Sequence, residues 1–427
     1  MLKMDIPQLV TSQLLNLGSR ISNKNLLHIV EALERYSAIR WHEQGFSAVK
    51  EMIREDHPGI QAVRRAIRNS NPRVRSKLIN NFVLGGLLQG YRKRLEFYEE
   101  HGVAPPGTLM ISPSMRCNLN CYGCCTGTHE KSSGLTRQET EDLISQAAQA
   151  GTNVVCFLGG EPLMIPWLLD VIEAYPRTGF QIYTNGLLLD EPKIERLARF
   201  GNALVTINFD GSEEENDRRK GQGTFKRALA AMQDLHDAGV IVGFSTMLSR
   251  YNFDSVYSDA FIDTMIEHGA VYGWVSIAIP QGKACTMPDL VPTPEQKAQI
   301  ADKVKQIRRE KDILLIDFHN DAYITEGCGA GRIIVHVNSN GDVEPCILFP
   351  FALDNIRNKP LSEIMKSDFL KGIRGISTSH PGRGQTCMLV NQPAEVLEVI
   401  DRTGARTTSE GTLEMLKDLA AAERAHE

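Results

Sequence analysis

The chain of 427 residues lacks the features that mark membrane, secreted and repetitive proteins. It has no uninterrupted apolar run near the roughly 20 residues that a membrane-spanning helix needs. Its first residues lack the basic segment, apolar core and small-residue cleavage site of a secretory signal. No solenoid-type repeat and no long low-complexity stretch is present. With 42% hydrophobic and 23% charged residues it has an ordinary globular composition, and we expect a cytoplasmic location.

A large excess of charge of one sign is also absent, because the net charge is only −5. The charge is nevertheless uneven: residues 1–100 carry 16 Lys and Arg against 10 Asp and Glu, and the remainder has the opposite balance. We interpret the basic end as the solvated surface of a helical region, with a membrane surface or another anionic partner as the alternative. No nucleic-acid partner is expected.

The spacing of apolar residues divides the chain into three regions. Residues 1–104 have helical periodicity and end before a Pro-Pro-Gly linker, whereas residues 105–312 alternate short apolar strands with helical segments. Residues 313–427 contain a strand, a hairpin with its turn at Asn340-Gly341, and short helices. Strands are expected at 108–112, 153–158, 180–183, 203–209, 240–247 and 272–279. These six β–α units predict an α/β fold whose parallel sheet is either doubly wound or curved into a partial barrel.

The cysteines carry the first chemical signal. Nine are present, an odd number with spacings unlike those of a small disulfide-linked domain. Cys117, Cys121 and Cys124 form a C-x3-C-x2-C pattern just after the first expected strand. Zinc usually takes four ligands in two pairs, whereas three neighbouring thiolates suit a 4Fe–4S cluster with one iron open to a small molecule. A zinc site or a structural cluster is the alternative.

This loop resembles the cysteine motif of the radical S-adenosylmethionine (radical SAM) superfamily. The second expected strand ends in Gly-Gly-Glu-Pro at 159–162, which resembles the GGEP motif of the same superfamily. Two glycines permit close backbone approach to a ligand, and a carboxylate suits an ammonium group. The pattern departs from the family at Gly123, where an aromatic residue is usual and Tyr122 stands one place earlier.

The resemblance implies a partial (β/α)6 TIM-like barrel, preceded by an all-helical region and followed by a small α+β domain. It implies a 4Fe–4S cluster on the three cysteines and reductive cleavage of SAM to a 5′-deoxyadenosyl radical, which abstracts hydrogen from a substrate. A flavodoxin or ferredoxin is the expected reductant. Polar residues at successive strand ends supply further SAM contacts. The implied contacts are Gly159, Gly160, Glu161, Asn185, Asn208, Asp210, Arg219 and Met247.

A second cysteine set lies in the last region. Cys328, Gly341 and Cys346 form a C-x12-G-x4-C pattern that resembles the opening half of the SPASM auxiliary-cluster region, or its shortened twitch form. The resemblance implies one auxiliary 4Fe–4S cluster on Cys328, Cys346 and Cys387. No spacing argument selects a fourth ligand. The candidates are Cys285, His336, His380 and Asp354.

Three other features leave alternatives open. Polar residues in the stretch 317–321 predict either a cavity wall with acid–base groups or a strand-end turn. Cys125 and Cys156 are interpreted mainly as packing residues. In residues 73–94, basic clusters flank an apolar face, which is typical of an interfacial helix and equally of a face packed on the barrel or on a second subunit.

The sequence therefore predicts a radical SAM enzyme. For its substrate we favour a lipid or acyl chain, because of residues 73–94, over a peptide or a small molecule. Peripheral association with a membrane follows from the same segment. The alternative class is a non-catalytic iron–sulfur protein for electron transfer or redox sensing, which would have no use for the GGEP motif.

Overall fold

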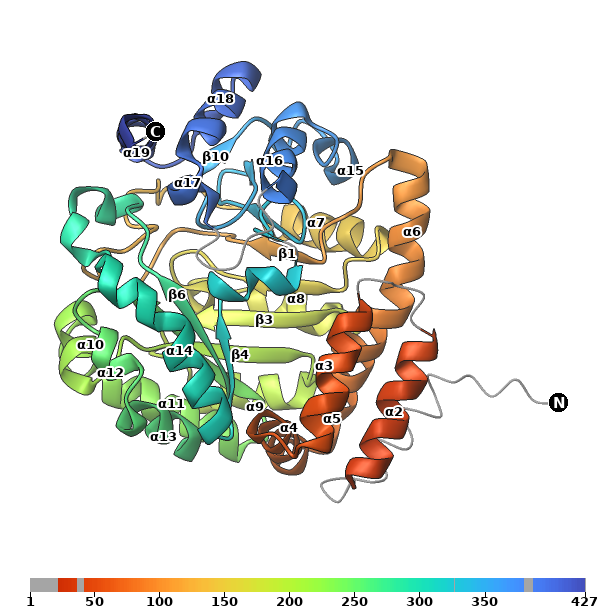
Figure 1. Ribbon diagram of the computed structural model, residues 1–427. Coiled ribbons are helices and arrows are strands. Elements are labelled where there is room, and N and C mark those ends of the chain that lie inside the picture. Colours follow the sequence, from red (N-terminus) through yellow and green to blue (C-terminus); the bar gives the residue numbers. More distant parts are fainter. Residues whose placement is uncertain (1–21, 37–41, 326, 380–386, 427) are drawn as a thin grey trace.

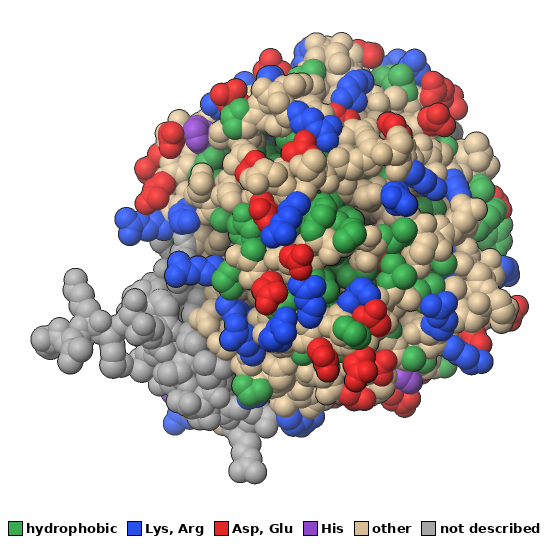
Figure 2. All heavy atoms as spheres, turned by 180° about the vertical axis from the view of Figure 1, so that it is seen from behind, with side chains coloured by type: hydrophobic (Ala, Val, Ile, Leu, Met, Phe, Trp, Pro, Cys, Tyr) green, Lys and Arg blue, Asp and Glu red, His purple; other side chains and the backbone are tan. Residues whose placement is uncertain are grey.

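The computed structural model describes residues 22–36, 42–325, 327–379 and 387–426. The first region is helical, as predicted, although its fifth element is a π-helix instead of an α-helix. Its elements are α2 (Asn23–Tyr36), α3 (His42–Arg54), α4 (Pro58–Asn69), α5 (Pro72–Lys77), η2 (Leu78–Gln89) and α6 (Gly90–His101). Acidic and basic side chains are interspersed on the face of the molecule in Figure 2.

One mostly parallel sheet forms the centre of the described chain (Figure 1). Its order is β7-β6-β5-β4-β3-β2-β1-β8-β9, and only the β8–β9 pair is antiparallel. The strands are β1 (Thr108–Ile111), β2 (Val154–Phe157), β3 (Gly179–Thr184), β4 (Ala203–Asn208), β5 (Val242–Leu248), β6 (Ala270–Ile277), β7 (Leu314–Asp317), β8 (Ile334–Val337) and β9 (Val343–Glu344). No pairing joins β7 to β8 among the described residues, so the barrel is partial, as predicted.

The sheet is larger than the six expected strands. β7 extends it beyond β6, and β8 pairs in parallel with β1, with Met110 opposite His336. The predicted hairpin is confirmed: β8 turns at Asn340-Gly341 into β9, and Gly341 takes a φ of 81° that favours glycine. The last region thus supplies strands to the barrel sheet in addition to its own small elements.

Helices cover the outer face of the sheet. Thr136, Ser212 and Thr293 begin three of them with capping boxes, and Gly239 follows α11 in the left-handed conformation expected of a stop. The covering helices are α7 (Arg137–Gln149), α8 (Leu168–Ala174), α9 (Glu191–Phe200), α10 (Glu213–Lys220), α11 (Thr224–Asp237), α12 (Phe253–Val256), α13 (Asp259–Glu267) and α14 (Pro294–Glu310). The C-terminal elements are β10 (Phe351–Ala352), α15 (Leu361–Ile364), α16 (Asp368–Ser379), α17 (Met388–Asn391), α18 (Pro393–Thr403), β11 (Arg406–Thr407) and α19 (Thr412–His426).

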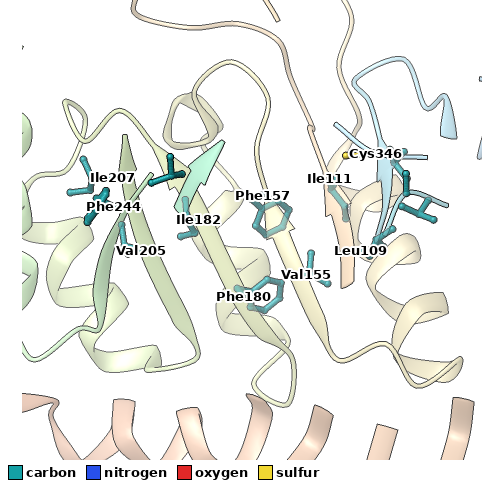
Figure 3. Close-up of a cluster of buried hydrophobic side chains, with 14 of the residues drawn as sticks. Leu109, Ile111, Val155, Phe157, Phe180, Ile182, Val205, Ile207, Phe244 and Cys346 are labelled. Atoms are coloured by element: carbon teal, nitrogen blue, oxygen red, sulfur yellow. The ribbon is translucent and has the colours of Figure 1, made fainter. Parts of the chain in front are cut away.

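The core lies between the sheet and these helices. Phe157 and Phe180 stack with their ring centroids 5.6 Å apart, and both are fully buried. Figure 3 shows the same cluster running from Phe244 across the sheet to Leu109 and Cys346. Burying such side chains contributes about 1.5–3 kcal/mol each, so this continuous layer fixes the strand order.

The amino-terminal helices pack on the amino ends of the strands. The Asn81 amide donates to the Thr178 carbonyl oxygen at 3.1 Å, and the Asn153 amide donates to the Gly85 carbonyl oxygen at 2.8 Å. Arg94 donates to the Gly151 carbonyl oxygen at 3.0 Å. For residues 73–94 the described contacts therefore support packing on the barrel over an interfacial helix. Two apolar residues of this segment, Val83 and Leu87, have side chains that lie outside the described part of the chain.

These contacts give no support to the predicted membrane association. Among the described residues, no helix is both long enough and apolar enough to cross a bilayer.

Candidate functional site

A cavity of about 300 Å³ opens at the carboxyl ends of the strands, where the sequence placed the site. All three cysteines of the first loop line it, together with most of the predicted SAM contacts. The predicted contacts that line it are Gly159, Gly160, Asn185, Asn208, Arg219 and Met247. Glu161 and Asp210 do not line it.

The cysteine loop is pinned on two sides. The Tyr122 N–H donates to the Arg219 carbonyl oxygen at 3.0 Å, and the Arg219 Nε donates back to the Tyr122 carbonyl oxygen at 3.1 Å. On the other side the Lys283 N–H donates to the Cys124 carbonyl oxygen at 3.1 Å. A loop between strands without a regular partner would otherwise vary in shape, so these contacts hold its thiols toward the cavity.

Gly123 explains the departure from the family pattern. Its φ is 63°, and a Cβ atom there would lie 2.2 Å from a methyl carbon of Leu290. A side chain at this position would require Leu290 to move and would adopt a backbone conformation that favours glycine. Tyr122 lies on the surface instead, and it is 46% exposed.

The two glycines of the GGEP motif face the chain's own loop. A Cβ atom on Gly159 would lie 2.4 Å from the Ser114 carbonyl oxygen, and one on Gly160 would lie 2.2 Å from the Arg116 carbonyl oxygen. The two glycines thus let the cysteine loop itself pack closely against the chain at the end of β2, where the sequence predicted the close approach of a ligand.

Glu161 braces two strand ends from behind the cavity wall, and its predicted contact with SAM stays a prediction. Its carboxylate is buried and accepts from the Thr184 hydroxyl at 2.7 Å and from the Asn185 N–H at 2.8 Å. A third bond comes from the Leu163 N–H at 3.1 Å. Burial raises the pKa of Glu161, and these hydrogen bonds oppose the rise. The carboxylate joins the end of β2 to the end of β3.

Asp210 also lies behind the cavity wall, and its predicted contact with SAM stays a prediction. Its carboxylate pairs with Arg219 at 2.6 Å and with Lys220 at 3.1 Å, and all three side chains are largely buried. Burial alone would raise the pKa of Asp210, but the two cations outweigh it and lower that pKa. Together the two cations and one carboxylate leave one excess positive charge beside the cysteine loop, which suits thiolates and a ligand carboxylate.

Two wall residues were missed by the sequence reasoning. Lys220 reaches the cavity, where its ammonium group also donates to the Asn208 carbonyl oxygen. Thr246 is buried near the end of β5 and lines the cavity, and its hydroxyl has no hydrogen-bond partner among the described residues. The dense charged run at 217–220 was a signal for Lys220. Nothing in the sequence distinguished Thr246 from other strand threonines.

Cys125 also lines this cavity, and Cys156 lies buried in β2. Burial raises the pKa of each thiol to about 12. Both are therefore protonated at neutral pH, which agrees with a packing role.

A second cavity, of about 620 Å³, lies between β7 and β8, where the sheet stays open. Cys328, Cys346 and Cys387 all line it, so the structure brings together cysteines that are far apart in the sequence. The two cavities share the side chains of Trp274, Phe318 and Leu348.

Three of the four proposed extra ligands, Cys285, His336 and Asp354, are absent from the lining of this cavity. His336 is engaged at both nitrogens, Asp354 pairs with Lys359 at 2.6 Å, and the Cys285 thiol contacts the Pro280 carbonyl oxygen. His380 lies outside the described residues.

The stretch 317–321 forms part of the wall of this second cavity. Asp317, His319 and Asp321 line it, which supports the cavity-wall interpretation. Asp317 also accepts from the Asn320 amide at 2.6 Å, so the strand-end turn is present as well. Burial lowers the pKa of His319 to about 4, so this imidazole is neutral at physiological pH.

Both cysteine sets offer what an iron–sulfur cluster needs. In each set three cysteine side chains line one cavity, and cysteine thiolates are the usual ligands of a 4Fe–4S cluster. Within each set the thiols are near enough to raise one another's pKa.

Known proteins share both halves of this arrangement. The model of the radical SAM superfamily matches residues 111–260, and the SPASM model, an iron–sulfur cluster-binding domain, matches residues 328–388. The mycofactocin maturase MftC of Mycobacterium tuberculosis is 30% identical over 270 residues, which are 60% of this chain and 67% of that protein. The PqqA peptide cyclase of Gluconobacter oxydans is 27% identical over 282 residues, 61% of this chain and 76% of that protein.

Other relatives widen the range. An AdoMet-dependent heme synthase of Methanosarcina barkeri is 26% identical over 279 residues, covering 59% of this chain and 79% of that protein. The crystal structure of Streptococcus suis SuiB bound to S-adenosylmethionine superimposes with a TM-score of 0.56 at 20% identity, covering 68% of this chain and 72% of that one. At that identity the likeness shows the fold alone.

Proposed function

The chain belongs to the radical SAM superfamily and carries a SPASM domain, and from this membership we propose that it modifies a peptide by abstracting hydrogen from one of its C–H bonds. The family assigns it a 4Fe–4S cluster with SAM and an auxiliary iron–sulfur cluster, and makes it an enzyme. When bound, the first cluster supplies the electron that cleaves SAM to the 5′-deoxyadenosyl radical. The non-catalytic iron–sulfur alternative has no support.

In the proposal each cysteine set holds one cluster. Cys117, Cys121 and Cys124 hold the first, and the cations Arg219 and Lys220 attract the carboxylate of SAM in the same cavity. Asn185, Asn208, Thr246 and Met247 complete the walls around the cofactor. Glu161 and Asp210 position these groups from behind. Cys328, Cys346 and Cys387 hold the auxiliary cluster.

The observation that carries the proposal is the junction of the two cavities. Trp274, Phe318 and Leu348 line both cavities, so the larger cavity lies directly beside the cavity of the first cysteine loop. This adjacency matters because a carbon radical reacts with whatever it meets, so its target must lie close to where it forms. The larger cavity is lined mainly by apolar side chains, and its polar side chains include Asp317, Asp321 and Arg308, which suits a peptide segment.

The relatives favour a peptide over the lipid that the sequence suggested. MftC is a mycofactocin maturase, the Gluconobacter enzyme is a PqqA peptide cyclase, and SuiB has been crystallised with its precursor peptide. The segment that motivated a lipid packs on the barrel instead. We retain the division at residues 104 and 312, and a flavodoxin or ferredoxin reductant, as parts of the proposal.

The test measures the transfer of deuterium from a labelled substrate to 5′-deoxyadenosine. The protein is reconstituted anaerobically, its iron and sulfide are counted, and SAM and dithionite are added with either a pool of side-chain-deuterated peptides or a deuterated fatty acid. We expect 5′-deoxyadenosine that carries deuterium only with the peptides. The Cys117/Cys121/Cys124→Ala variant is the control and forms none. Deuterium from the fatty acid alone would overturn the peptide assignment, and an iron-loaded protein that never forms 5′-deoxyadenosine would overturn the enzyme.

A further inference from the structure

A buried hydrogen-bonded line crosses the sheet between the two cysteine sets. The Ser112 Oγ and the His336 Nε2 lie 2.7 Å apart, and the His336 Nδ1 lies 2.6 Å from Glu344 Oε2. Ser112 and His336 have no exposed surface, and Glu344 is 1% exposed. A polar line of this depth costs free energy unless every group is bonded, so its presence in the core calls for a reason.

The line has the order of a hydrolytic triad but cannot perform that chemistry. Neither Ser112, His336 nor Glu344 lines either of the two cavities, so no substrate reaches the serine hydroxyl. The line belongs to the sheet itself: Ser112 follows β1, His336 lies on β8, and Glu344 lies on β9.

Each end of the line reaches one cluster region. Ser112 is five residues before Cys117, and its Cβ lies 3.3 Å from where a Cβ on Gly159 would stand, at the seat of the first loop. Glu344 is two residues before Cys346, which belongs to the buried core beside Ile111 (Figure 3). His336 is the only link between them in this line.

Glu344 is held fully bonded, so the line is stiff. Its Oε1 accepts from the Asn338 amide at 2.9 Å and from the Thr408 hydroxyl, and its Oε2 faces His336. The two ring nitrogens of His336 bond Ser112 on one side and Glu344 on the other, so neither polar atom of the imidazole is left without a partner.

Further contacts follow the same path. Ser133, downstream of the first loop, donates to the Asn340 side chain at the β8–β9 turn, and the Thr128 and Ser409 hydroxyls lie 3.0 Å apart. His129 lies close enough to Glu344 and His336 for their charges to act on it. The first loop therefore rests on the hairpin that carries Cys346.

We propose that Ser112, His336 and Glu344 are positioning residues that fix the first cluster loop and the auxiliary cluster loop relative to each other. The inference rests on the proposed function, because it assumes a cluster on each cysteine set. Groups that hydrogen-bond metal ligands change metal affinity or activity by about 10–100-fold when they are removed. This line lies one step farther out and touches no ligand, so its loss should loosen both clusters by about the lower end of that range.

The experiment separates the two clusters by mutation. The Cys328/Cys346/Cys387→Ala variant retains the first cluster only, and the Cys117/Cys121/Cys124→Ala variant retains the auxiliary cluster only. Into each we introduce His336→Leu, which removes both bonds, and His336→Gln, which can donate at one end and accept at the other. Thr206→Val is the matched control, because Thr206 is fully buried on the same sheet and bonds Gln181 at 2.9 Å and Tyr272 at 2.8 Å, away from both cysteine sets.

The readouts are the rate of iron loss to a chelator and the electron paramagnetic resonance line shape of the reduced cluster. We expect His336→Leu to speed iron loss by about tenfold in both backgrounds and to alter both spectra. His336→Gln should restore most of the parent behaviour, and Thr206→Val should change neither.

Ser112→Ala is a second, milder variant, which tests the inference even if the His336 variants fail to fold. It removes only the end of the line at the first loop, so it should affect the first cluster more than the auxiliary one. Equal effects of His336→Leu and Thr206→Val, or no effect of Ser112→Ala on the first cluster, would overturn the inference. A parent protein that takes up no iron would instead overturn the proposed function.

Discussion

The two cysteine regions are held in place by different kinds of contact. Cys117, Cys121 and Cys124 lie within eight residues on one loop, half-buried in a cavity with two buried cations nearby. Cys346 and Cys387 belong to or pack against the hydrophobic core, and 59 residues separate Cys328 from Cys387. The first region needs access for SAM, so its support comes from ion pairs and backbone contacts behind the loop. The second is supported by the packed core itself.

The largest expected effect separates the two regions by activity. The Cys117/Cys121/Cys124→Ala variant should form no 5′-deoxyadenosine, because no thiolate remains to hold the first cluster. The Cys328/Cys346/Cys387→Ala variant should still cleave SAM but modify no substrate. Iron counts and chromatography of the products check both. Loss of SAM cleavage in the second variant, with its first cluster loaded, would contradict the independence of the two regions.

Asp210→Asn should strongly destabilise the support of the first loop. It leaves Arg219 and Lys220 buried without their counter-charge, which costs about 3–5 kcal/mol in comparable buried pairs. Urea unfolding of the iron-free protein measures the loss. Asp190→Asn, at an exposed ion pair with Lys193, is the control and should cost less than about 1 kcal/mol. Similar losses in the two variants would show that burial of the first pair is unimportant.

The same pair predicts a pH dependence. The pKa of Asp210 is lowered in the folded state, so its stabilisation is complete above the ordinary carboxyl pKa and is lost as pH falls through the folded value. The difference in unfolding free energy between parent and Asp210→Asn should therefore be constant near neutrality and shrink below about pH 4. A difference that grew on acidification would reject the assignment.

Gly160→Ala should unseat the first loop. Its new methyl group would overlap the Arg116 carbonyl oxygen, and overpacking of this kind costs about 1–3 kcal/mol. Iron uptake at the first site should fall with it, while the auxiliary site keeps its iron. Gly375→Ala, on the exposed face of α16 with nothing within 4 Å, should instead raise the unfolding free energy by up to about 1 kcal/mol. If Gly160→Ala were as stable as the parent protein, the loop would be able to move away from the new methyl group at little cost.

The smallest effect concerns the auxiliary side. The buried Ser377 hydroxyl donates to the Cys328 carbonyl oxygen, so Ser377→Ala removes one hydrogen bond worth about 1 kcal/mol. Iron loss from the auxiliary cluster should quicken slightly, and the first cluster should be unchanged. Comparing chelator rates in the two triple-alanine backgrounds detects it. A change confined to the first cluster would contradict the placement.

The part of this site that was predictable is the part encoded by residues close together in the sequence. Cys117, Cys121 and Cys124 are visible because their ligand geometry is encoded in neighbouring residues, and the GGEP motif because two glycines stand at a strand end. The protein partners of Glu161 and Asp210 were not predictable in this way. A carboxylate at a strand end suggests a ligand contact, and only the structure shows that these two also bond Thr184, Arg219 and Lys220.

The sequence by itself determined the class of fold, the superfamily and the cysteine sets, because periodicity, strand-end motifs and short spacings act over a few residues. Only the tertiary structure decided that β7 and β8 extend the barrel, that residues 73–94 pack on its amino end, and that two cavities meet at Trp274. These depend on which distant surfaces exclude water together and on which buried polar groups find partners. The line from Ser112 through His336 to Glu344 is the clearest case, since its ends lie 232 residues apart in the chain and are joined only by the pairing of three strands.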